Sequence, residues 1–454
     1  MKLSVIILAA GQGTRMRSSL PKVLHRLGGK SLLAHVIETA GQLRADRVNV
    51  VYGHGGARVR EALADAPVHW VEQREQLGTG HAVDQVMPMI GDDHVALVLY
   101  GDVPLITATT LAPMVEQARE GVLSVLTAKL DNPSGYGRII RGASGKVVDI
   151  VEQKDAGPEQ LRIREINTGF LAVPAVLLRK WLSGLDNRNA QGEYYLTDIV
   201  AMAVNDGVPV ESVRAEDTDE VLGVNDRVQL AHLERVYQRR CAEALMRAGV
   251  TLADPARFDV RGEVEAGIDS YIDVNSVFEG KVVLGEGVRI GPNCLIRDAT
   301  LGDGVEVLAN SVIDTARIGS ACRIGPFARI RPDTELAEGV HIGNFVEVKK
   351  SRIAAGSKVN HLSYIGDTHM GAGVNVGAGT ITCNYDGASK HLTEIGDDVF
   401  IGSDTQLVAP VKVGDGATIG AGTTVTRDVP PGKLTLSRSQ QKTVDGWSRP
   451  VKKP

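Results

Sequence analysis

The chain has 454 residues, a formal net charge of −5 and four cysteines, and its length indicates two or more domains. The negative charge and the lack of a long basic stripe argue against a nucleic-acid-binding protein. The cysteines (Cys241, Cys294, Cys322 and Cys383) lack C-x-x-C spacing, so neither a zinc site nor a disulfide framework is expected. A reducing, cytoplasmic setting is the simplest expectation. The apolar run Ser4–Ala10 is too short to cross a membrane, so no membrane insertion is expected.

The first predicted element is a buried parallel strand over Ser4–Leu8, followed at once by a glycine-rich turn over Ala9–Met16. Backbone N–H groups in such a turn can approach phosphates closely, which favours a nucleotide site. The turn is not the dinucleotide fingerprint, because Met16 stands where a third glycine is needed, and no Walker-type Gly-Lys-Ser/Thr follows. A plain tight turn between a strand and a helix stays an alternative.

Two cations follow this turn. Arg15 lies just past the glycines, and Lys22 comes soon after it. Together they could neutralise a triphosphate and the charge that develops on a leaving pyrophosphate. A single Arg or Lys is more often a solvated surface residue, so the prediction depends on the two occurring together behind the turn.

Strands and helices then alternate along the chain. We expect a strand over Val48–Tyr52, a helix over Ala57–Ala64, a helix over Gly78–Val86 and a buried strand over Val95–Tyr100. This alternation predicts an α/β domain with a mainly parallel sheet. Ligands bind beyond the carboxyl ends of such strands, so Asp102, just past the last of them, is a candidate Mg²⁺ ligand. A helix cap or a turn residue is the alternative for Asp102.

One long helix is predicted over residues 226–248, capped at its start by Asn225 or Asp226 and ended by Gly249. At 1.5 Å per residue it would span about 34 Å. We expect a linker helix (226–249) between a first domain (1–225) and a second domain (250–454), with packing inside one domain as the alternative. The apolar stripe that supports the helix consists of Leu230, Leu233, Tyr237, Cys241, Ala244 and Ala248.

From Leu284 to Val425 an aliphatic residue recurs at every sixth position, with a few one-residue slips, and glycine often follows it. A period of six fits neither the 3.6 residues of a helical turn nor one long alternating strand. It is typical of a short strand plus a turn, and it predicts a parallel β-helix whose coils must stack to be stable. The repeat breaks between Thr382 and Ile395, where the chain is expected to leave the coil. A clear run is Ile318, Ile324, Ile330, Leu336, Ile342 and Val348.

Short motifs along the whole chain resemble those of one family. In the first half they are LAAGQGTRM, PKVLH, EQLGTGHA, YGDVPL, GYGRI, EINTG, GEYYLTD and GVNDR. In the second half they are RIRPD, GNFVEVKKS, NHLSYIGD, GAGTITCNYDG and IGSDTQLVAPV. The chain thereby resembles the bacterial bifunctional N-acetylglucosamine-1-phosphate uridyltransferases and glucosamine-1-phosphate acetyltransferases nearly end to end. The resemblance implies a Rossmann-like nucleotidyltransferase domain, a linker helix, and a left-handed parallel β-helix of hexapeptide repeats.

For the first domain, the resemblance implies transfer of uridyl from UTP to N-acetylglucosamine 1-phosphate, giving UDP-N-acetylglucosamine and pyrophosphate. Arg15 and Lys22 would stabilise the reacting phosphates, and Asp102 and Asn225 would hold Mg²⁺. Because the sugar phosphate is the nucleophile, no protein base is required. The implied nucleotide and sugar contacts are Leu8, Ala9, Ala10, Gly11, Lys22, Gln73, Gly78, Thr79, Tyr100, Gly101, Asp102, Gly137, Glu152, Asn167 and Asn225.

The second domain resembles an acetyl-CoA-dependent acetyltransferase that acts on glucosamine 1-phosphate. Acetylation of an amine needs a base, and histidine titrates near the working pH. Spacing alone does not choose among His341, His361, His369 and His391; the resemblance places the base at His361, with Glu347 orienting or polarising it. The implied phosphosugar contacts are Arg331, Lys349, Tyr364 and Asn375, with Lys390 as a further candidate. The implied acetyl-CoA contacts are Ala378, Asn384, Tyr385, Ser403, Ala421 and Arg438.

Three interpretations compete at this point. The chain is a bifunctional enzyme that supplies UDP-N-acetylglucosamine for peptidoglycan and lipopolysaccharide, a sugar-nucleotide pyrophosphorylase with a structural or regulatory β-helix, or a non-catalytic scaffold. The presence of Arg15, Lys22 and Asp102 argues against the scaffold, and His361 with the Asn-Tyr-Asp-Gly segment argues against a single activity. A homotrimer with each acetyl site between neighbouring β-helices follows from the resemblance alone.

Overall fold

The computed structural model describes residues 1–11, 13–53, 55–438 and 440–452. The chain divides into two compact units, Met1–Tyr237 and Gln238–Pro454. The division falls inside helix α8 (Arg227–Arg247), at the place where the sequence predicts one long helix. Among the described residues, no helix is both long and apolar enough to cross a membrane.

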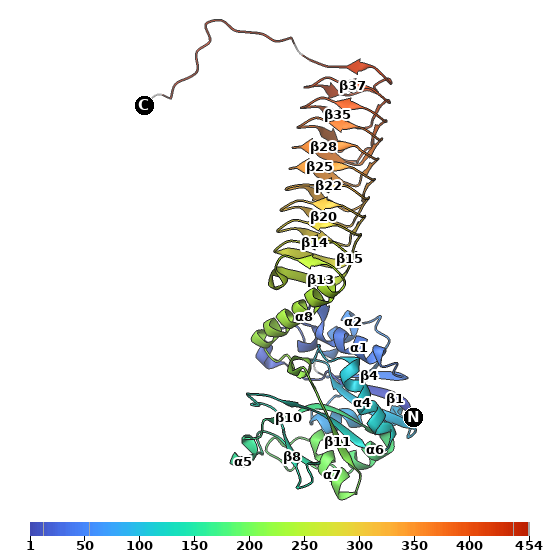
Figure 1. The fold of residues 1–454 in the computed structure, drawn as a ribbon, viewed down its shortest axis with the longest axis vertical. Helices are drawn as coiled ribbons and strands as arrows, with labels where there is room; N and C mark the ends of the chain where they lie inside the picture. Colours follow the sequence, from blue (N-terminus) through green and yellow to red (C-terminus); the bar gives the residue numbers. More distant parts are fainter. Residues whose placement is uncertain (12, 54, 439, 453–454) are drawn as a thin grey trace. The chain divides into compact units, whose positions relative to one another are not determined.

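The first unit is an α/β domain built on one large sheet. Its strands are β1 (Lys2–Leu8), β4 (Arg47–Tyr52), β5 (His69–Glu72), β6 (His94–Tyr100), β7 (Leu123–Lys129), β8 (Arg138–Arg141), β9 (Val147–Val151), β10 (Glu165–Pro174) and β11 (Val210–Arg214), with a separate hairpin of β2 (Arg26–Leu27) and β3 (Lys30–Ser31). The order is β11-β7-β10-β6-β1-β4-β5, and β8 and β9 extend from β10 (Figure 1). Along this described path only β10 runs against the other strands. The predicted mainly parallel sheet is therefore confirmed.

Helices cover both faces of this sheet. They are α1 (Leu32–Gln42), α2 (Gly56–Ala62), α3 (Thr79–Asp84), α4 (Ala108–Arg119), α5 (Pro158–Leu161), α6 (Ala175–Leu182) and α7 (Ile199–Asn205). Along β1, Leu3, Val5 and Ile7 join the apolar cluster that contains α1 and α4, while Ile6 and Leu8 join the cluster that contains α3, α6 and α7. A strand that is apolar on both faces, as β1 is, is expected for a parallel strand covered on both sides.

Helix α8 begins as predicted. Asp226 caps it by accepting hydrogen bonds from the backbone N–H groups of Val228 and Gln229, both at 2.9 Å. Within the first unit, Leu233 on this helix is buried together with Met16. The domain limits expected from the sequence, 1–225 and 250–454, stay a prediction.

Within the second unit, the buried face of α8 differs from the predicted stripe. Gln238, Ala242 and Leu245 are buried, whereas Ala244 and Ala248 are exposed. The side-chain amide of Gln238 exchanges two hydrogen bonds with the backbone of Val260, at 2.6 and 2.7 Å. A polar residue can be buried when it is satisfied in this way, and hydropathy gives no sign of it.

The second unit is a parallel β-helix with three faces (Figure 1). The first face consists of β12 (Thr251–Leu252), β14 (Tyr271–Ile272), β16 (Arg289–Ile290), β19 (Glu306–Val307), β22 (Arg323–Ile324), β25 (His341–Asn344), β28 (Lys358–His361), β31 (Asn375–Val376), β34 (Phe400–Ile401), β37 (Thr418–Ile419) and β39 (Leu434–Thr435). The second face contains β17 (Leu295–Arg297), β20 (Val312–Asp314), β23 (Arg329–Ile330), β26 (Glu347–Lys349), β29 (Tyr364–Gly366), β32 (Ile381–Cys383), β35 (Gln406–Val408) and β38 (Thr424–Val425). The third face contains β18 (Thr300–Leu301), β21 (Ala316–Ile318), β24 (Thr334–Leu336), β27 (Arg352–Ile353), β30 (Thr368–Met370), β33 (Thr393–Ile395) and β36 (Val411–Val413). Two long strands, β13 (Phe258–Ala266) and β15 (Ser276–Leu284), bend from the second face into the third.

The six-residue repeat fills the axis of this β-helix. Ile318, Ile324 and Ile330 are buried and lie on the third, first and second faces in turn, so three sextets make one coil. The predicted β-helix is confirmed. Its first coils precede the repeat counted from the sequence. There Phe258 and Phe278, with ring centroids 5.6 Å apart, fill the axis together with Leu252, Val260 and Ile272.

The corner between the first and second faces carries an exposed apolar ridge. In successive coils, Phe327, Phe345 and Leu362 adopt left-handed backbone conformations, with φ of 56, 55 and 48°. Bulky residues are unusual there. The two phenyl rings stack with centroids 5.3 Å apart, and the three side chains are 48, 55 and 63% exposed. In the earlier coils the same corner holds residues that tolerate this conformation, Asn275, Asn293 and Asn310.

The chain leaves the coil where the repeat breaks. It departs after β32 and returns at β33, as predicted from the gap between Thr382 and Ile395. An antiparallel bridge between Tyr385 and Lys390 closes the excursion. Inside it, the Asp386 carboxylate accepts two backbone hydrogen bonds at 2.7 and 2.8 Å. These bonds hold the excursion as a defined loop over the edge of the stack.

Candidate active sites

A cavity of about 580 Å³ lies in the first unit, where β1 and β6 end at Leu8 and Tyr100. This is the edge at which open α/β sheets bind ligands. Ten of the residues expected to contact nucleotide line it, which are Leu8, Ala9, Ala10, Gly11, Lys22, Gln73, Gly78, Thr79, Tyr100 and Asp102. It is also lined by Val23, Gln76, Ala82 and Glu193, which the sequence did not single out.

Four polar side chains from distant parts of the first unit meet at this edge. The Arg15 guanidinium donates a hydrogen bond of 2.9 Å to the Asn225 Oδ1 atom, and the Lys22 ammonium lies 3.3 Å from the same oxygen. The Lys22 ammonium also forms an ion pair with the Asp102 carboxylate. The side chains of Lys22 and Asp102 are only 13 and 17% exposed, so salt screens this pair less than a surface pair. The result is a compact cluster of two cations and two oxygen ligands.

The glycine-rich entrance to α3 is held against a later segment of the first unit. Gly78 has a φ of 114°, and a Cβ atom there would lie 2.7 Å from the Tyr194 carbonyl oxygen, so only glycine fits. The Gly80 N–H group donates to that carbonyl at 2.9 Å. The Thr79 hydroxyl accepts from the Leu196 N–H group at 3.1 Å. These contacts fix one wall of the cavity.

The residues expected at the sugar are neighbours of one another. The Asn167 N–H group donates to the Gly137 carbonyl at 2.9 Å, and a Cβ atom on Gly137 would lie 3.4 Å from Glu152 Oε1. The Thr197 hydroxyl donates to the same Glu152 oxygen at 3.2 Å. Burial raises the pKa of Glu152 above its usual range, and the Thr197 hydrogen bond opposes this effect. Gly101 follows Tyr100, whose pKa is also raised by burial.

Asp102 and Asn225 are the residues of the first unit that fit a magnesium ion. One offers a carboxylate and the other an amide oxygen, and both oxygens already face the Lys22 ammonium. Mg²⁺ is usually held by one or two protein oxygens together with substrate phosphates and water, so this donor set suits it. Among the described residues, no group of three or more His, Cys, Asp or Glu side chains forms an all-protein metal site.

His361 lies at the end of β28, at the corner between the first and second faces of the β-helix. Its Nδ1 atom is 3.0 Å from Oδ1 of Asn344, which is in register one coil earlier. An amide oxygen only accepts hydrogen bonds, so in the neutral ring this contact places the hydrogen on Nδ1 and leaves the lone pair on Nε2. The His361 side chain is exposed, so Nε2 is accessible to a substrate.

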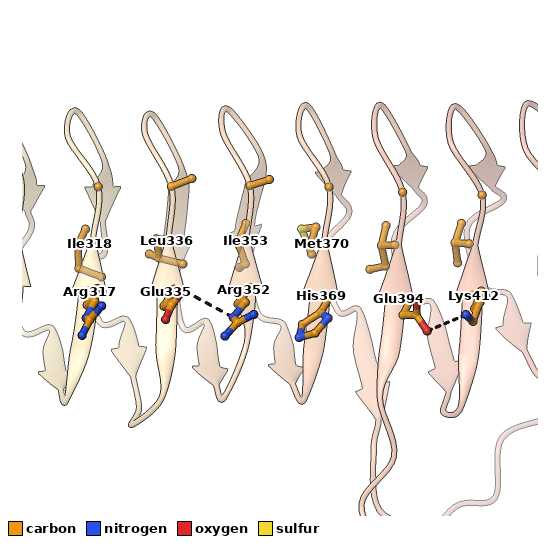
Figure 2. Close-up of a pocket in the computed structure, with 18 of the residues that line it drawn as sticks. Arg317, Ile318, Glu335, Leu336, Arg352, Ile353, His369, Met370, Glu394 and Lys412 are labelled. Atoms are coloured by element: carbon orange, nitrogen blue, oxygen red, sulfur yellow. Dashed lines mark ion pairs between the residues drawn. The ribbon is translucent and has the colours of Figure 1, made fainter.

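The other histidines of the β-helix have different surroundings. His341 lies on the first face, in β25. His391 is paired with Asp386 inside the excursion, at 2.7 Å. His369 lines a groove of about 1180 Å³ on the third face, and the expected site residues lie outside this groove (Figure 2). The groove is a column of mostly alternating charges, a type of surface pairing that contributes about 0–1 kcal/mol per pair. The other charges in it are Arg317, Glu335, Arg352, Glu394 and Lys412.

Glu347 has a partner other than the one expected. Its Oε1 atom accepts a hydrogen bond of 2.7 Å from the Arg331 guanidinium. The contact that orients the His361 ring comes instead from Asn344. A role for Glu347 toward the base stays a prediction.

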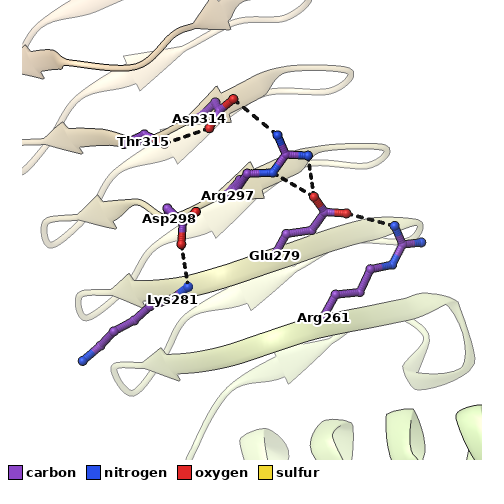
Figure 3. Close-up of polar contacts among 7 residues, drawn as sticks. All are labelled: Arg261, Glu279, Lys281, Arg297, Asp298, Asp314 and Thr315. Carbon is purple, nitrogen blue, oxygen red and sulfur yellow. Dashed lines mark hydrogen bonds and ion pairs between the residues drawn. The ribbon is translucent and has the colours of Figure 1, made fainter. Parts of the chain in front are cut away.

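A ladder of ion pairs runs along the second face from Arg261 to Asp314 (Figure 3). Its members alternate in charge, with nitrogen-to-oxygen distances of 2.9, 2.5 and 3.4 Å. Arg331 and Lys349 occupy the same position in the next two coils, so the column changes there from paired charges to two successive cations. The ladder consists of Arg261, Glu279, Arg297 and Asp314.

Positive charge and a tyrosine gather beyond this ladder. The neighbouring Lys349 ammonium lowers the pKa of Lys390, because the two like charges repel. An anion bound between them would relieve this repulsion. The Tyr364 ring lies over Gly366, where a Cβ atom would be 2.4 Å from the phenol oxygen. The Asn384 amide nitrogen is 3.5 Å from that oxygen.

Four of the residues expected to contact acetyl-CoA form a column at one corner of the stack. Ala378, Ser403 and Ala421 each follow a glycine at the end of a first-face strand, and the guanidinium of Arg438 donates to the Ala421 carbonyl at 3.0 Å. A Cβ atom on the glycines before Ala378 and Ser403 would lie 2.5 and 2.4 Å from the backbone nitrogen of the next coil. Glycine therefore allows the coils to stack closely here.

Two expected residues lie apart from these groups. Asn375 is on the first face, whereas Arg331 and Tyr364 belong to the second, so a single chain does not bring them together. Tyr385 is 60% exposed, and its hydroxyl donates to the Gly387 carbonyl at 2.6 Å.

Family models match both units. A MobA-like NTP transferase domain matches residues 5–253, a GMPPB C-terminal domain matches residues 260–341, and a bacterial transferase hexapeptide model of six repeats matches residues 392–427. A relative named Bifunctional protein GlmU from Methylococcus capsulatus is 62% identical, over 100% of this chain and 98% of the relative. Relatives with the same name from Alkalilimnicola ehrlichii and an Azoarcus species are each 60% identical, over 100 and 99% of this chain and 97 and 100% of their own lengths. The chain belongs to the GlmU family.

In this member of the GlmU family, reasoning from the sequence missed three contacts that shape the sites. Gln76 donates a hydrogen bond of 2.7 Å to the Ala10 carbonyl, Thr197 holds Glu152, and Asn344 holds His361. All three lie inside motifs quoted above, EQLGTGHA, GEYYLTD and GNFVEVKKS. The motifs therefore contained the signal, but only the fold shows which of their residues meet.

Proposed function

We propose that this chain is a bifunctional enzyme that carries out two successive steps. Its second unit acetylates glucosamine 1-phosphate with acetyl-CoA, and its first unit joins the resulting N-acetylglucosamine 1-phosphate to the uridyl group of UTP. The observation that carries the proposal is that each unit holds its own group of reactive side chains in a chain 62% identical, over its full length, to a protein named as bifunctional. The product, UDP-N-acetylglucosamine, would supply peptidoglycan and lipopolysaccharide synthesis.

In the acetyl transfer, His361 is the base. The amine of glucosamine 1-phosphate attacks the thioester carbon of acetyl-CoA, a C–N bond forms and the C–S bond breaks. The amine proton passes to Nε2 of His361 and from there to the departing sulfur, so coenzyme A leaves as a thiol. The hydrogen bond from His361 Nδ1 to Asn344 supports this role, because it orients the ring and, in the neutral ring, leaves the lone pair on Nε2.

The phosphate of this substrate is proposed to bind to the cations of the second face. Arg331, Lys349 and Lys390 supply positive charge there, and the neighbouring Lys349 ammonium lowers the pKa of Lys390. Arginine and lysine are the usual partners of phosphate. Tyr364 and Asn375 complete the proposed sugar contacts, and acetyl-CoA is proposed to lie along the column from Ala378 to Arg438, beside Asn384 and Tyr385.

In the uridyl transfer, an oxygen of the sugar phosphate attacks the α-phosphorus of UTP, and the bond to the leaving pyrophosphate breaks. Arg15 and Lys22 neutralise the charge on the phosphates, so positioning and electrostatics carry the rate without a protein base. Gln73 is buried and donates its amide hydrogens to the Gly78 carbonyl and to His81, both at 3.1 Å. This leaves the amide oxygen of Gln73 to accept a hydrogen bond from a base such as uracil.

Mg²⁺ is the metal proposed for this step, held by Asp102 and Asn225 together with phosphate oxygens. When bound, the ion adds positive charge where the triphosphate reacts. The paired cations Arg15 and Lys22 at the same place are consistent with a highly charged substrate.

We further propose that the protein is a homotrimer in the cytoplasm, with each acetyl site shared between neighbouring β-helices. The ridge of Phe327, Phe345 and Leu362 supports this, because it is apolar, exposed and adjacent to His361. Asn375, which lies on another face of its own chain, would then serve the site of a neighbour. Sedimentation equilibrium tests the proposal, and a monomeric mass would contradict it.

Two assays on one purified preparation test the bifunctional proposal. Glucosamine 1-phosphate with acetyl-CoA should release free thiol, and N-acetylglucosamine 1-phosphate with UTP and Mg²⁺ should release pyrophosphate. Pyrophosphate without thiol would favour the alternative, a pyrophosphorylase whose β-helix is structural or regulatory. Neither product from folded protein would favour a non-catalytic scaffold.

A further inference from the structure

Arg138 is a buried cation beside the residues expected at the sugar, and the chemistry above gives it no part. It is the first residue of β8, it is only 2% exposed, and burial lowers its pKa. Arginine is almost never fully buried unless a partner compensates its charge. Among the described residues, no carboxylate pairs with Arg138, and its Nε atom has no hydrogen-bond partner. Because such burial costs stability, it indicates a task besides packing.

The guanidinium of Arg138 holds the turn that precedes it. One of its terminal nitrogens donates a hydrogen bond to the Tyr136 carbonyl, and the other donates to Oε1 of Gln153 at 3.3 Å. The same oxygen of Gln153 accepts a hydrogen bond from the Gly135 N–H group. Gln153 follows β9, the strand that pairs with β8. Arg138 and Gln153 together therefore fix the backbone of residues 135–137.

The contact with Arg138 sets the direction of the peptide group between Tyr136 and Gly137. This group is trans, so its C=O and N–H bonds point in opposite directions. A carbonyl held by Arg138 therefore turns the Gly137 N–H group away from Arg138. Gly137 is buried, and among the residues that the structure describes nothing accepts a hydrogen bond from its N–H group. Buried N–H groups without a partner are rare, so this one indicates a place where a ligand supplies the acceptor.

The neighbours of Gly137 are the other residues expected at the sugar. Its carbonyl accepts a hydrogen bond from the Asn167 N–H group at 2.9 Å, and a Cβ atom built on it would lie 3.4 Å from Glu152 Oε1. Glycine has no side chain that would keep the peptide group in one orientation, so without the guanidinium this group could turn over. The hydrogen bond from Arg138 opposes that rotation.

We propose that Arg138 is a positioning residue for uridyl transfer, which holds the Tyr136 carbonyl so that the Gly137 N–H group donates a hydrogen bond to an oxygen of the sugar. The inference rests on the uridyl transfer proposed above. The cationic guanidinium also polarises the peptide group, which makes the N–H at its other end a stronger donor. Arg138 touches neither substrate, and it acts through this one peptide group.

The first test removes the guanidinium and keeps most of the packing. Arg138→Met is a long side chain without charge or donors, and we expect the KM for N-acetylglucosamine 1-phosphate to rise about tenfold, the effect of one lost hydrogen bond. The KM for UTP should change less than threefold, since other residues line the nucleotide cavity. Arg141→Met, at an exposed arginine of the same strand, is the matched control and should keep both wild-type KM values.

A second test uses the wild-type protein, so it does not depend on any variant being folded. Its two probes are UDP-N-acetylglucosamine, which carries the sugar, and UDP, which lacks it. Hydrogen exchange at the Gly137 amide should be at least tenfold slower with UDP-N-acetylglucosamine than with UDP, because only the sugar supplies an acceptor for this N–H group. Mass spectrometry with fragmentation to single residues measures the exchange.

Two results would overturn the inference. One is a KM for N-acetylglucosamine 1-phosphate in Arg138→Met that equals that of Arg141→Met, or that rises only as much as the KM for UTP. The other is a rate of exchange at the Gly137 amide that is the same with both probes. Both differ from a failure of the proposed function, in which the wild-type protein itself releases no pyrophosphate from UTP and N-acetylglucosamine 1-phosphate.

Discussion

In the first unit, the side chains that meet are far apart in the sequence, since Arg15 and Lys22 contact Asn225 across 210 and 203 residues. In the second unit, the corresponding contacts join successive coils. Asn344 holds His361 across 17 residues, and Asn384 is bonded to Asp367 across 17 residues. The first site exists only when the whole α/β unit has folded, whereas the second is assembled coil by coil. We infer that each site can be disabled without disturbing the other.

Replacing the proposed base should have the largest effect. In His361→Ala, acetyl transfer should fall by about 10²–10⁴-fold, the usual contribution of general base catalysis, while uridyl transfer is unchanged. Free-thiol release and pyrophosphate release measure the two activities. His369→Ala, on the third face, is the control and should keep both. Loss of both activities in folded His361→Ala would contradict independent sites.

Replacing the proposed metal ligand should disable uridyl transfer and leave acetyl transfer intact. Asp102→Ala should lose Mg²⁺-dependent pyrophosphate release, since a carboxylate ligand and the partner of Lys22 disappear together. Thiol release should stay at the wild-type level. Asp65→Ala, an exposed position in the same unit, is the control. Unchanged uridyl transfer in Asp102→Ala would refute the metal role.

Removing the hydrogen-bond partner of the His361 ring should have a smaller effect on acetyl transfer. Asn344→Ala should lower kcat for acetyl transfer about tenfold, because the His361 ring loses the contact that sets its tautomer and direction. Asn344→Asp keeps an acceptor at this position, so it should retain more acetyl transfer than Asn344→Ala. Equal kcat in the two variants would show that residue 344 does not act through the His361 ring.

Adding a side chain at Gly78, in the turn that precedes α3, should lower stability and activity in the first unit alone. In Gly78→Ala the new Cβ atom would lie 2.7 Å from the Tyr194 carbonyl oxygen, so we expect a loss of about 1–3 kcal/mol in stability and weaker uridyl transfer. Thermal unfolding and pyrophosphate release measure this. Gly121 also has a positive φ, 88°, but its Cβ position is open, so Gly121→Ala reports the backbone strain without the clash. Equal losses of stability and of pyrophosphate release in the two variants would show that the close approach of Gly78 to Tyr194 does not matter.

The smallest expected effect concerns a carboxyl near the sugar residues. Burial, and then the charge of Asp149, raises the pKa of Asp198 to about 6. Since this folded-state pKa exceeds the unfolded value, the ionised group destabilises the fold increasingly as the pH rises through that interval. Asp198→Asn should therefore raise Tm relative to the wild-type protein, and more at pH 8 than at pH 4. A difference in Tm that does not depend on pH would contradict the shift.

The two units also differ in how much of their structure could be predicted from the sequence. The β-helix was predictable because each coil repeats the same inward aliphatic positions. Its first coils were not predicted, because Phe278 interrupts the aliphatic series at the position that Ile296 fills one coil later. In the first unit, apolar runs predicted the strands β1, β4 and β6, and the other strands of the sheet were not predicted. The site contacts were harder, because a hydrogen bond such as that from His361 to Asn344 leaves no trace in hydropathy or spacing.

Burial of polar side chains was the other property that the sequence did not reveal. Gln238 and Asp367 are both buried because a specific partner satisfies them, a backbone amide in one case and a side-chain amide in the other. Such pairs depend on register between elements, which is set only when the coils stack. The motifs predicted which short segments contribute to the sites, and only the structure shows which residues of those segments contact one another.

Mixing two disabled variants tests most directly the claim that the two units carry separate activities. Glucosamine 1-phosphate, acetyl-CoA, UTP and Mg²⁺ are supplied to His361→Ala, to Asp102→Ala, and to a mixture of the two, and UDP-N-acetylglucosamine is measured. Neither variant alone should form the product, and the mixture should form it, because Asp102→Ala makes the acetylated sugar phosphate that His361→Ala then uses. Product from either variant alone, or none from the mixture, would contradict the claim.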